Sequence, residues 1–248
     1  MNSKEIVSKA KQSFERVLDN EKYANIIKDD KHLKLLLEMI EGKQCENILD
    51  IGTGTGYLAF PLAQINPSAQ VYGIDIAENI VEKNQSRAQE DGISNVKFLS
   101  FDGVDYPFED STFDLMVTRH AFHHFPKVDD AVKKLSKILK EGGSILIADP
   151  MKTENDTSGV IDRFMDIKGD GHVEFYSKTK LEGIFASHGF VVEKQIITTM
   201  TFPFPPKREY VDLFNSISEK EKSLYQIEMR NGIVWVGNIE VGNTLFVK

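Results

Sequence analysis

The sequence predicts an α/β fold built on a mostly parallel sheet, and three observations carry this prediction. Short apolar runs alternate with helical patterns between residues 46 and 149, which is the rhythm of βαβ units. A glycine-rich loop, GTGTG at residues 52–56, follows the first of these runs. Each of the first three runs also has an aspartate at its end, and parallel strands present those ends at one edge of a sheet.

Two amphipathic helices are expected before the sheet begins. Apolar residues recur at helical spacing over residues 3–18 and again over residues 31–41, where Gly42 can end the second helix. The first helix either packs on the core or covers a ligand site as a lid, and the sequence leaves both interpretations open. We assign residues 1–42 to this N-terminal part.

The first strand, Asn47–Ile51, leads into the glycine loop and a helix start. Glycines let the backbone approach a ligand closely, and a helix N-terminus offers free N–H groups to an anionic group. The spacing differs from the dinucleotide fingerprint G-x-G-x-x-G, because Tyr57 stands where the last glycine should be. The carboxylate of Asp50 would repel a pyrophosphate but attract an ammonium or sulfonium group. These features favour a nucleotide-like ligand that carries positive charge.

The second strand, residues 70–76, includes Asp75, which lies 21 residues after Gly54. This is the usual distance to the acidic residue that accepts the ribose hydroxyl groups in nucleotide-binding βαβ units. Ile76 is then placed to contact an adenine face. The alternative interpretation is that Asp75 only caps the helix that follows.

The third strand, residues 96–101, is followed by Asp102 and Gly103. A carboxylate at this position can accept a hydrogen bond from an adenine amino group, and the glycine lets the turn pass close to the ligand. A fourth strand is expected at 113–118 and a fifth at 144–149, with a helix between them.

The segment 47–149 resembles class I S-adenosylmethionine (SAM) dependent methyltransferases. The glycine loop with Asp50 is similar to motif I of that family, Pro107-Phe108 followed by Ser111-Thr112-Phe113-Asp114 is similar to another of its signatures, and LKEGGSILIAD at 139–149 is also typical of it. The later segment HVEFYSKTKLEGIFASHGF resembles the UbiE/YcgJ-like small-molecule branch better than methyltransferases of nucleic acids or proteins.

The resemblance implies one methyltransferase domain over residues 1–248, with its SAM-binding core at 43–150 and cap insertions at 151–176 and 203–238. It implies a Rossmann-like, seven-stranded, mostly parallel sheet in the order 3-2-1-4-5-7-6, with the last strand antiparallel, helices on both faces and a small helical cap. The cofactor would be SAM and the product S-adenosylhomocysteine. The methyl acceptor would be a small molecule that the sequence does not identify.

The cofactor-binding residues implied by the family are those of the strand ends and the glycine loop. They are Asp50, Gly52, Thr53, Gly54, Gly56, Asp75, Ile76, Asp102, Gly103 and Arg119.

The catalytic candidates are histidines that follow the fourth strand, where the methyl group of the cofactor would point. A base helps if the acceptor is a hydroxyl or an acidic carbon, and histidine titrates near neutrality. We favour His120, with His123 and His124 next, although His-His-Phe recurs in this branch and His124 also fits a structural role. Tyr23 and His172 are candidate substrate contacts. A three-histidine metal site lacks carboxylates at a recognisable spacing, so no metal is expected.

The composition limits the kinds of partner and the location that we expect for this protein. The net charge is −8 without a Lys/Arg block, so nucleic acid is not an expected partner. The single cysteine, Cys45, excludes an internal disulfide and a cysteine zinc site. No apolar run reaches the length of a membrane span, and the first residues show no signal-peptide pattern, so we expect a cytoplasmic protein, monomeric or homodimeric.

Two other functions remain open at this point. One is an NAD(P)-dependent oxidoreductase, which the loop spacing and Asp50 disfavour. The other is a SAM-binding protein without catalytic activity, which would keep the same cofactor motifs.

Overall fold

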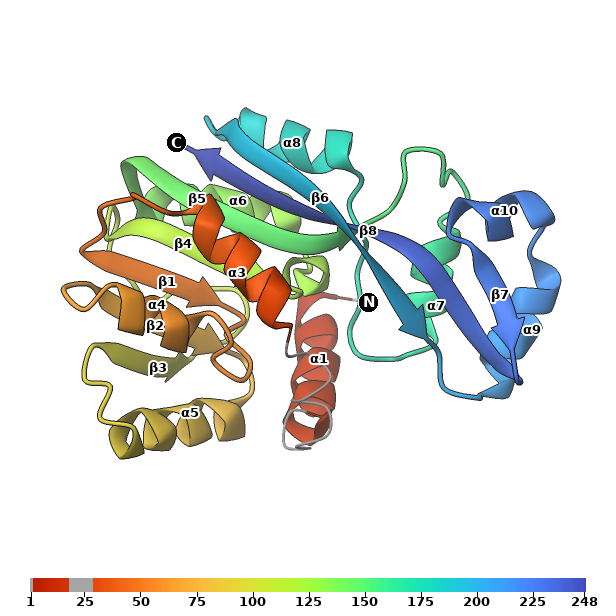
Figure 1. Cartoon of the computed structure of the whole chain (residues 1–248), viewed down its shortest axis with the longest axis horizontal. Helices are drawn as coiled ribbons and strands as arrows, with labels where there is room; N and C mark the ends of the chain where they lie inside the picture. The colour runs from red at the N-terminus through yellow and green to blue at the C-terminus, as the bar shows by residue number, and fades with distance from the viewer. Residues whose placement is uncertain (1, 18–28) are drawn as a thin grey trace.

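A computed structural model of the chain describes residues 2–17 and 29–248 (Figure 1). The strands in these ranges form one eight-stranded sheet in the order β3-β2-β1-β4-β5-β8-β6, with β7 paired to β8 outside this path. The strands are β1 Asn47–Ile51, β2 Gln70–Asp75, β3 Val96–Ser100, β4 Phe113–Arg119, β5 Leu139–Met151, β6 Val191–Pro203, β7 Ile227–Arg230 and β8 Ile233–Val247.

The predicted strand order is confirmed. The pairs among β1 to β5 are parallel, and β8 is antiparallel to both β5 and β6. β8 therefore takes the place of the predicted seventh, antiparallel strand, and β7 is an addition.

Helices cover both faces of the sheet. They are α1 Ser3–Val17, α3 Asp30–Met39, α4 Ala59–Ile65, α5 Glu78–Glu90, α6 Val128–Ile138, α7 Val160–Asp166, α8 Lys178–Ser187, α9 Arg208–Ser216 and α10 Glu219–Leu224, with a 3-10 turn η1 at Phe122–His124. Neighbouring strand residues point to opposite faces. Ile48 accordingly joins a core with α3, α4 and α5, whereas Leu49 joins another with α6 and α8. No helix in the described ranges has the length and apolar character that a membrane crossing requires.

A third core lies beyond the sheet, in a unit that we call the cap: α7, α9, α10, β7 and the outer ends of β6 and β8 (Figure 1). Phe164 stacks on Phe204 with ring centroids 5.4 Å apart, and Tyr210 lies 4.6 Å from Phe204. The segments predicted as insertions, 151–176 and 203–238, both contribute to this core.

Two details of the cap differ from the sequence-based expectation. The pattern Ser218-x-x-Glu221 predicts the start of a helix that reaches about Arg230, but the helix ends at Leu224 and β7 follows. Gln226 has a left-handed backbone (φ 49°), which stops the helix, and pairing with β8 then stabilises β7. The sequence after Gly232 predicts two short strands, at 233–236 and 242–248, but the structure has one continuous strand, β8.

Ser218→Ala is expected to lower the free energy of unfolding by about 1 kcal/mol. The Ser218 hydroxyl accepts the N–H of Glu221 (3.2 Å), and the Glu221 carboxylate accepts the N–H of Ser218 (2.8 Å), which forms a capping box. Urea denaturation measures the change. Ser223→Ala is the control, because that hydroxyl only bonds the Lys220 carbonyl on an exposed helix face. Equal losses for both variants would contradict a capping role.

Candidate functional site

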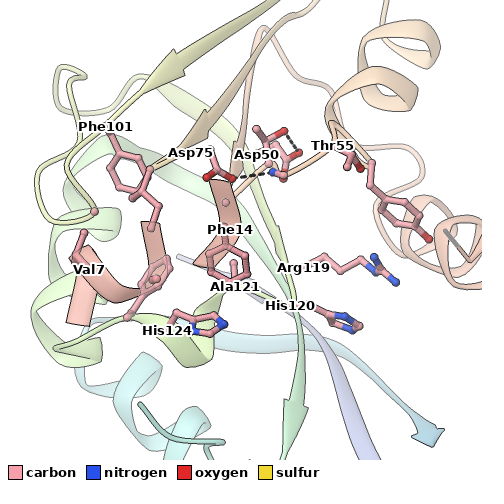
Figure 2. Close-up of a pocket in the computed structure, with 18 of the residues that line it drawn as sticks. Val7, Phe14, Asp50, Thr55, Asp75, Phe101, Arg119, His120, Ala121 and His124 are labelled. Atoms are coloured by element: carbon pink, nitrogen blue, oxygen red, sulfur yellow. Dashed lines mark hydrogen bonds between the residues drawn. The ribbon is translucent and has the colours of Figure 1, made fainter. Parts of the chain in front are cut away.

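The carboxyl ends of β1, β2 and β4 open into one pocket with about 1040 Å³ of empty space, part of which is open solvent. In Figure 2, Asp50 and Asp75 lie at one end of the pocket and His120 and His124 at the other, with Phe14 of α1 between them. The predicted residues that line it are Asp50, Gly52, Thr53, Gly54, Asp75, Ile76, Gly103, Arg119, His120 and His124.

The glycine loop has a backbone that only glycine adopts easily. Gly52 has φ 67°, and a Cβ there would lie 2.6 Å from the Cβ of Ala121. Gly54 has φ 50° and lines the pocket, and a Cβ there would have no neighbour closer than 4.0 Å. The loop thus brings bare backbone to the place where a ligand can lie.

Asp75 holds this loop in position. Its Oδ2 accepts the N–H of Gly54 (2.9 Å), and its Oδ1 accepts the N–H of Ala77 (3.0 Å) at the start of α5. Asn84, which sequence reasoning missed, donates from Nδ2 to the Gly54 carbonyl (2.7 Å). Burial raises the pKa of Asp75. The carboxylate therefore bonds the N–H of the residue that precedes α5 and still lines the pocket, so it both supports the backbone and faces the ligand space.

Asp50 is a second buried carboxylate, with only 2% of its surface exposed. Its Oδ2 accepts the Thr53 hydroxyl (2.7 Å) and the N–H of Ala59 (3.1 Å), so Oδ1 has no hydrogen-bond donor among the described residues. Burial raises the pKa of Asp50 to about 7. A carboxylate with a spare oxygen and little water around it is suited to a cationic ligand group.

Arg119 closes the pocket at the end of β4. Its guanidinium lies 4.1 Å from the centre of the Tyr57 ring, and its Nε donates to Nδ1 of His32 (3.1 Å). Sequence reasoning missed His32, because 87 residues separate it from Arg119 and no motif surrounds it.

His120 combines an unusual backbone with an unpaired ring nitrogen. It has φ 54°, in the left-handed region, while its N–H still bonds the Ala148 carbonyl (2.9 Å). Its Nε2 is buried without a hydrogen-bond partner in the described part of the chain. Burial, with nearby Arg119, holds the pKa of His120 well below its usual value, so the ring is neutral. Such backbone strain often marks a functional residue.

The two histidines of η1 differ in their surroundings. His124 lines the pocket, its ring meets the edge of Phe14 at 5.0 Å, and burial lowers its pKa to about 3. His123 lies outside the lining. Its Nδ1 is 2.9 Å from Oδ2 of Asp149, which also accepts the backbone N–H of His123 (3.0 Å). These two bonds hold η1 against β5.

Other predicted residues also lie outside the lining. Gly56 faces the ring of Phe60. Asp102 is exposed, and its Oδ1 accepts the backbone N–H groups of residues 104 and 105. His172 bonds Asp162 through Nε2 (2.8 Å). Tyr23 is not among the described residues. No cluster of His, Cys, Asp or Glu that could hold a metal is found within 2–17 and 29–248.

The helix α1 covers the pocket. A Cβ at Gly103 would lie 3.0 Å from Val7 and 3.2 Å from Ile76, so Val7 sits directly over this turn. Lys11 forms an ion pair with Glu78 on α5 at 2.6 Å. α1 therefore packs on the core and also lies across the pocket, because Ala10 and Phe14 line it. A lid role for α1 stays a prediction.

The comparisons with known proteins agree with this geometry. A family model described as a methyltransferase domain matches residues 43–199. The chain is 30% identical over 178 residues to the uncharacterized methyltransferase YcgJ of Bacillus subtilis, covering 67% of this chain and 68% of that protein. It is 33% identical over 118 residues to phosphoethanolamine N-methyltransferase 2 of Caenorhabditis elegans, but there it covers 48% of this chain and only 27% of that protein.

Solved structures show the same fold. The crystal structure of Bacillus subtilis YcgJ matches with a TM-score of 0.77 at 23% identity, covering 89% of this chain and 99% of that chain. A geranyl diphosphate methyltransferase in complex with SAM matches with a TM-score of 0.63 at 16% identity, covering 88% of this chain and 84% of that chain.

Proposed function

The chain belongs to the methyltransferase domain family, and we propose that its pocket binds SAM, whose methyl group the enzyme transfers to a small molecule. The protein is a SAM-dependent methyltransferase. The observation that carries the proposal is that Asp50, Asp75, the glycine loop and Arg119 all line one pocket under α1.

The residues present fit SAM. The open space beside Gly54 leaves room for a ligand against the loop backbone. The buried carboxylates and the cation of Arg119 are matched to the ammonium, ribose hydroxyls and carboxylate of SAM. We assign Asp75 to the ribose hydroxyls, Asp50 to the ammonium group and Arg119 to the carboxylate. Ile76 and Gly103 would contact the adenine, and a contact from Asp102 stays a prediction.

The other end of the pocket would receive the acceptor. Bound SAM supplies an electrophilic methyl group on its sulfonium sulfur. The chain excludes water with α1, whose Ala10 and Phe14 line the pocket together with Phe125. His120 would take the proton of an acceptor hydroxyl or acidic carbon at its free Nε2, and His124 would border the same space. Water exclusion and alignment supply the remaining rate enhancement.

The proposal is tested by incubating the protein with methyl-labelled SAM and a metabolite extract, followed by an untargeted search for labelled small molecules. A labelled product that depends on the intact protein supports a catalyst. SAM binding without any product would favour the non-catalytic alternative. Thermal stabilisation by NAD but not by SAM would favour the oxidoreductase, for which the comparisons give no support.

The affinity for SAM is expected to fall as the pH falls below 7. Asp50 has a pKa of about 7 in the free protein, and the ligand's ammonium group would lower it in the complex. Because the ionised form binds better, affinity is full above this pKa and is lost below it. If SAM binds only the ionised form of Asp50, Kd rises about tenfold for each pH unit between 7 and about 5.

Isothermal titration at several pH values measures this dependence. Asp50→Asn is the control and should bind more weakly at neutral pH, with a flatter profile. A wild-type Kd that stays constant over the range would contradict the role of Asp50.

A further inference from the structure

A chain of hydrogen bonds runs from the pocket wall to the far strands of the sheet through His32 on α3. Arg119 Nε donates to Nδ1 of His32 (3.1 Å), and Nε2 of His32 lies 2.7 Å from Oδ1 of Asn243 on β8. Asn243 is fully buried, and its Nδ2 donates to the Ile196 carbonyl (3.0 Å) and to the Thr198 hydroxyl (3.1 Å) on β6.

The partners of Asn243 determine which ring nitrogen of His32 carries the proton. The amide nitrogen of Asn243 faces a backbone carbonyl, which can only accept, so the amide oxygen is the atom that faces His32. Nε2 of His32 must therefore donate. A neutral imidazole then has its lone pair on Nδ1, towards Arg119. Burial lowers the pKa of His32, which favours this neutral form.

The second support of Arg119 is attached to the same helix. The Tyr57 ring lies under the guanidinium, and the Tyr57 hydroxyl donates to the carbonyl of Asp29, the N-cap residue of α3. The Asp29 carboxylate accepts the backbone N–H of His32 (3.0 Å). His32 and Tyr57, which each contact Arg119, are thus tied to the first turn of α3.

We infer that His32 is a positioning residue for cofactor binding. Its Nδ1 fixes Nε of Arg119, so that the terminal nitrogens present their N–H groups to the carboxylate of SAM. The guanidinium is planar, and a hydrogen bond at Nε together with a ring below fixes the orientation of the whole fork. The inference rests on the role proposed above for Arg119, and His32 acts only through that residue.

The experiment compares two ligands by isothermal titration against the full chain. SAM and decarboxylated SAM share the adenosine, the sulfonium and the ammonium group, but only SAM has the carboxylate. The ratio of their Kd values is the carboxylate preference, and a loss of folded protein does not change this ratio. Arg119→Ala should lower the preference about tenfold or more.

Two substitutions at His32 then separate positioning from general stability. His32→Asn places an oxygen near the position of Nδ1 and should keep the preference within about threefold of wild type. His32→Gln reaches instead towards Asn243, lacks an acceptor for Arg119, and should lower the preference about tenfold. The double variant with Arg119→Ala should show no further loss.

The possible outcomes separate a failure of the role of His32 from a failure of the proposed role of Arg119. Equal weakening of both ligands by His32→Gln would overturn the inference, because His32 would then only stabilise α3. A preference that falls with Arg119→Ala but not with His32→Gln overturns it as well, and leaves the proposed function intact. A preference unchanged in Arg119→Ala removes the carboxylate role of Arg119 from the proposed function itself.

Discussion

Asp75→Ala is expected to raise the Kd for SAM about 100-fold or more. The carboxylate would accept two ribose hydroxyls, and charged acceptors in buried sites make the stronger hydrogen bonds. The substitution also frees the N–H of Gly54, which Asp75 holds at 2.9 Å, so the glycine loop loses its support. Isothermal titration with SAM measures the loss.

The controls separate lost ligand contacts from lost structure. Asp75→Asn keeps the size of the side chain and should still weaken binding strongly, because an amide has only one acceptor oxygen. Asp91→Ala removes an exposed carboxylate at the other end of α5 and should leave Kd within about twofold. Thermal unfolding checks that each variant is folded. An unchanged affinity in Asp75→Ala would remove that residue from the site.

The sheet and the glycine loop were predictable because their signals are local. Each strand of the core is a short apolar run with a turn signal beside it, and Gly52 to Gly56 carry their conformation in their residue type. The cap was less predictable. Residues 227–230 continue a helical pattern, yet they pair with β8 because the remote strand offers hydrogen bonds and a buried place for Ile227.

The candidate site was predictable where a residue adjoins a strand end and not where packing supplies it. Asp50 and Asp75 line the pocket because their strands end there. His32 contacts Arg119 only because the fold brings α3 to the end of β4, and its partner on β8 is 211 residues away. His123 shows the reverse case. Its position in the sequence suggested a catalytic base, but its ring and its backbone N–H both bond the Asp149 carboxylate, and it lies outside the pocket lining.

His120→Asn is expected to lower kcat about 100-fold to 10,000-fold and to leave the Kd for SAM within about threefold. The amide cannot take a proton from the acceptor, whereas the neutral imidazole can do so at its buried Nε2. Asparagine suits the test because it tolerates the left-handed backbone at this position better than alanine does. Turnover is measured with the acceptor that the labelling experiment identifies.

The pH profile and a second variant decide whether His120 is the base. A base is active when neutral, and burial holds the pKa of His120 well below its usual value. At saturating SAM, wild-type kcat should therefore not fall between pH 7 and about pH 6, where an ordinary histidine would become protonated. His124→Phe, which keeps an aromatic ring against Phe14, should reduce kcat much less. Normal turnover in His120→Asn, or a larger loss in His124→Phe, would move the base away from His120.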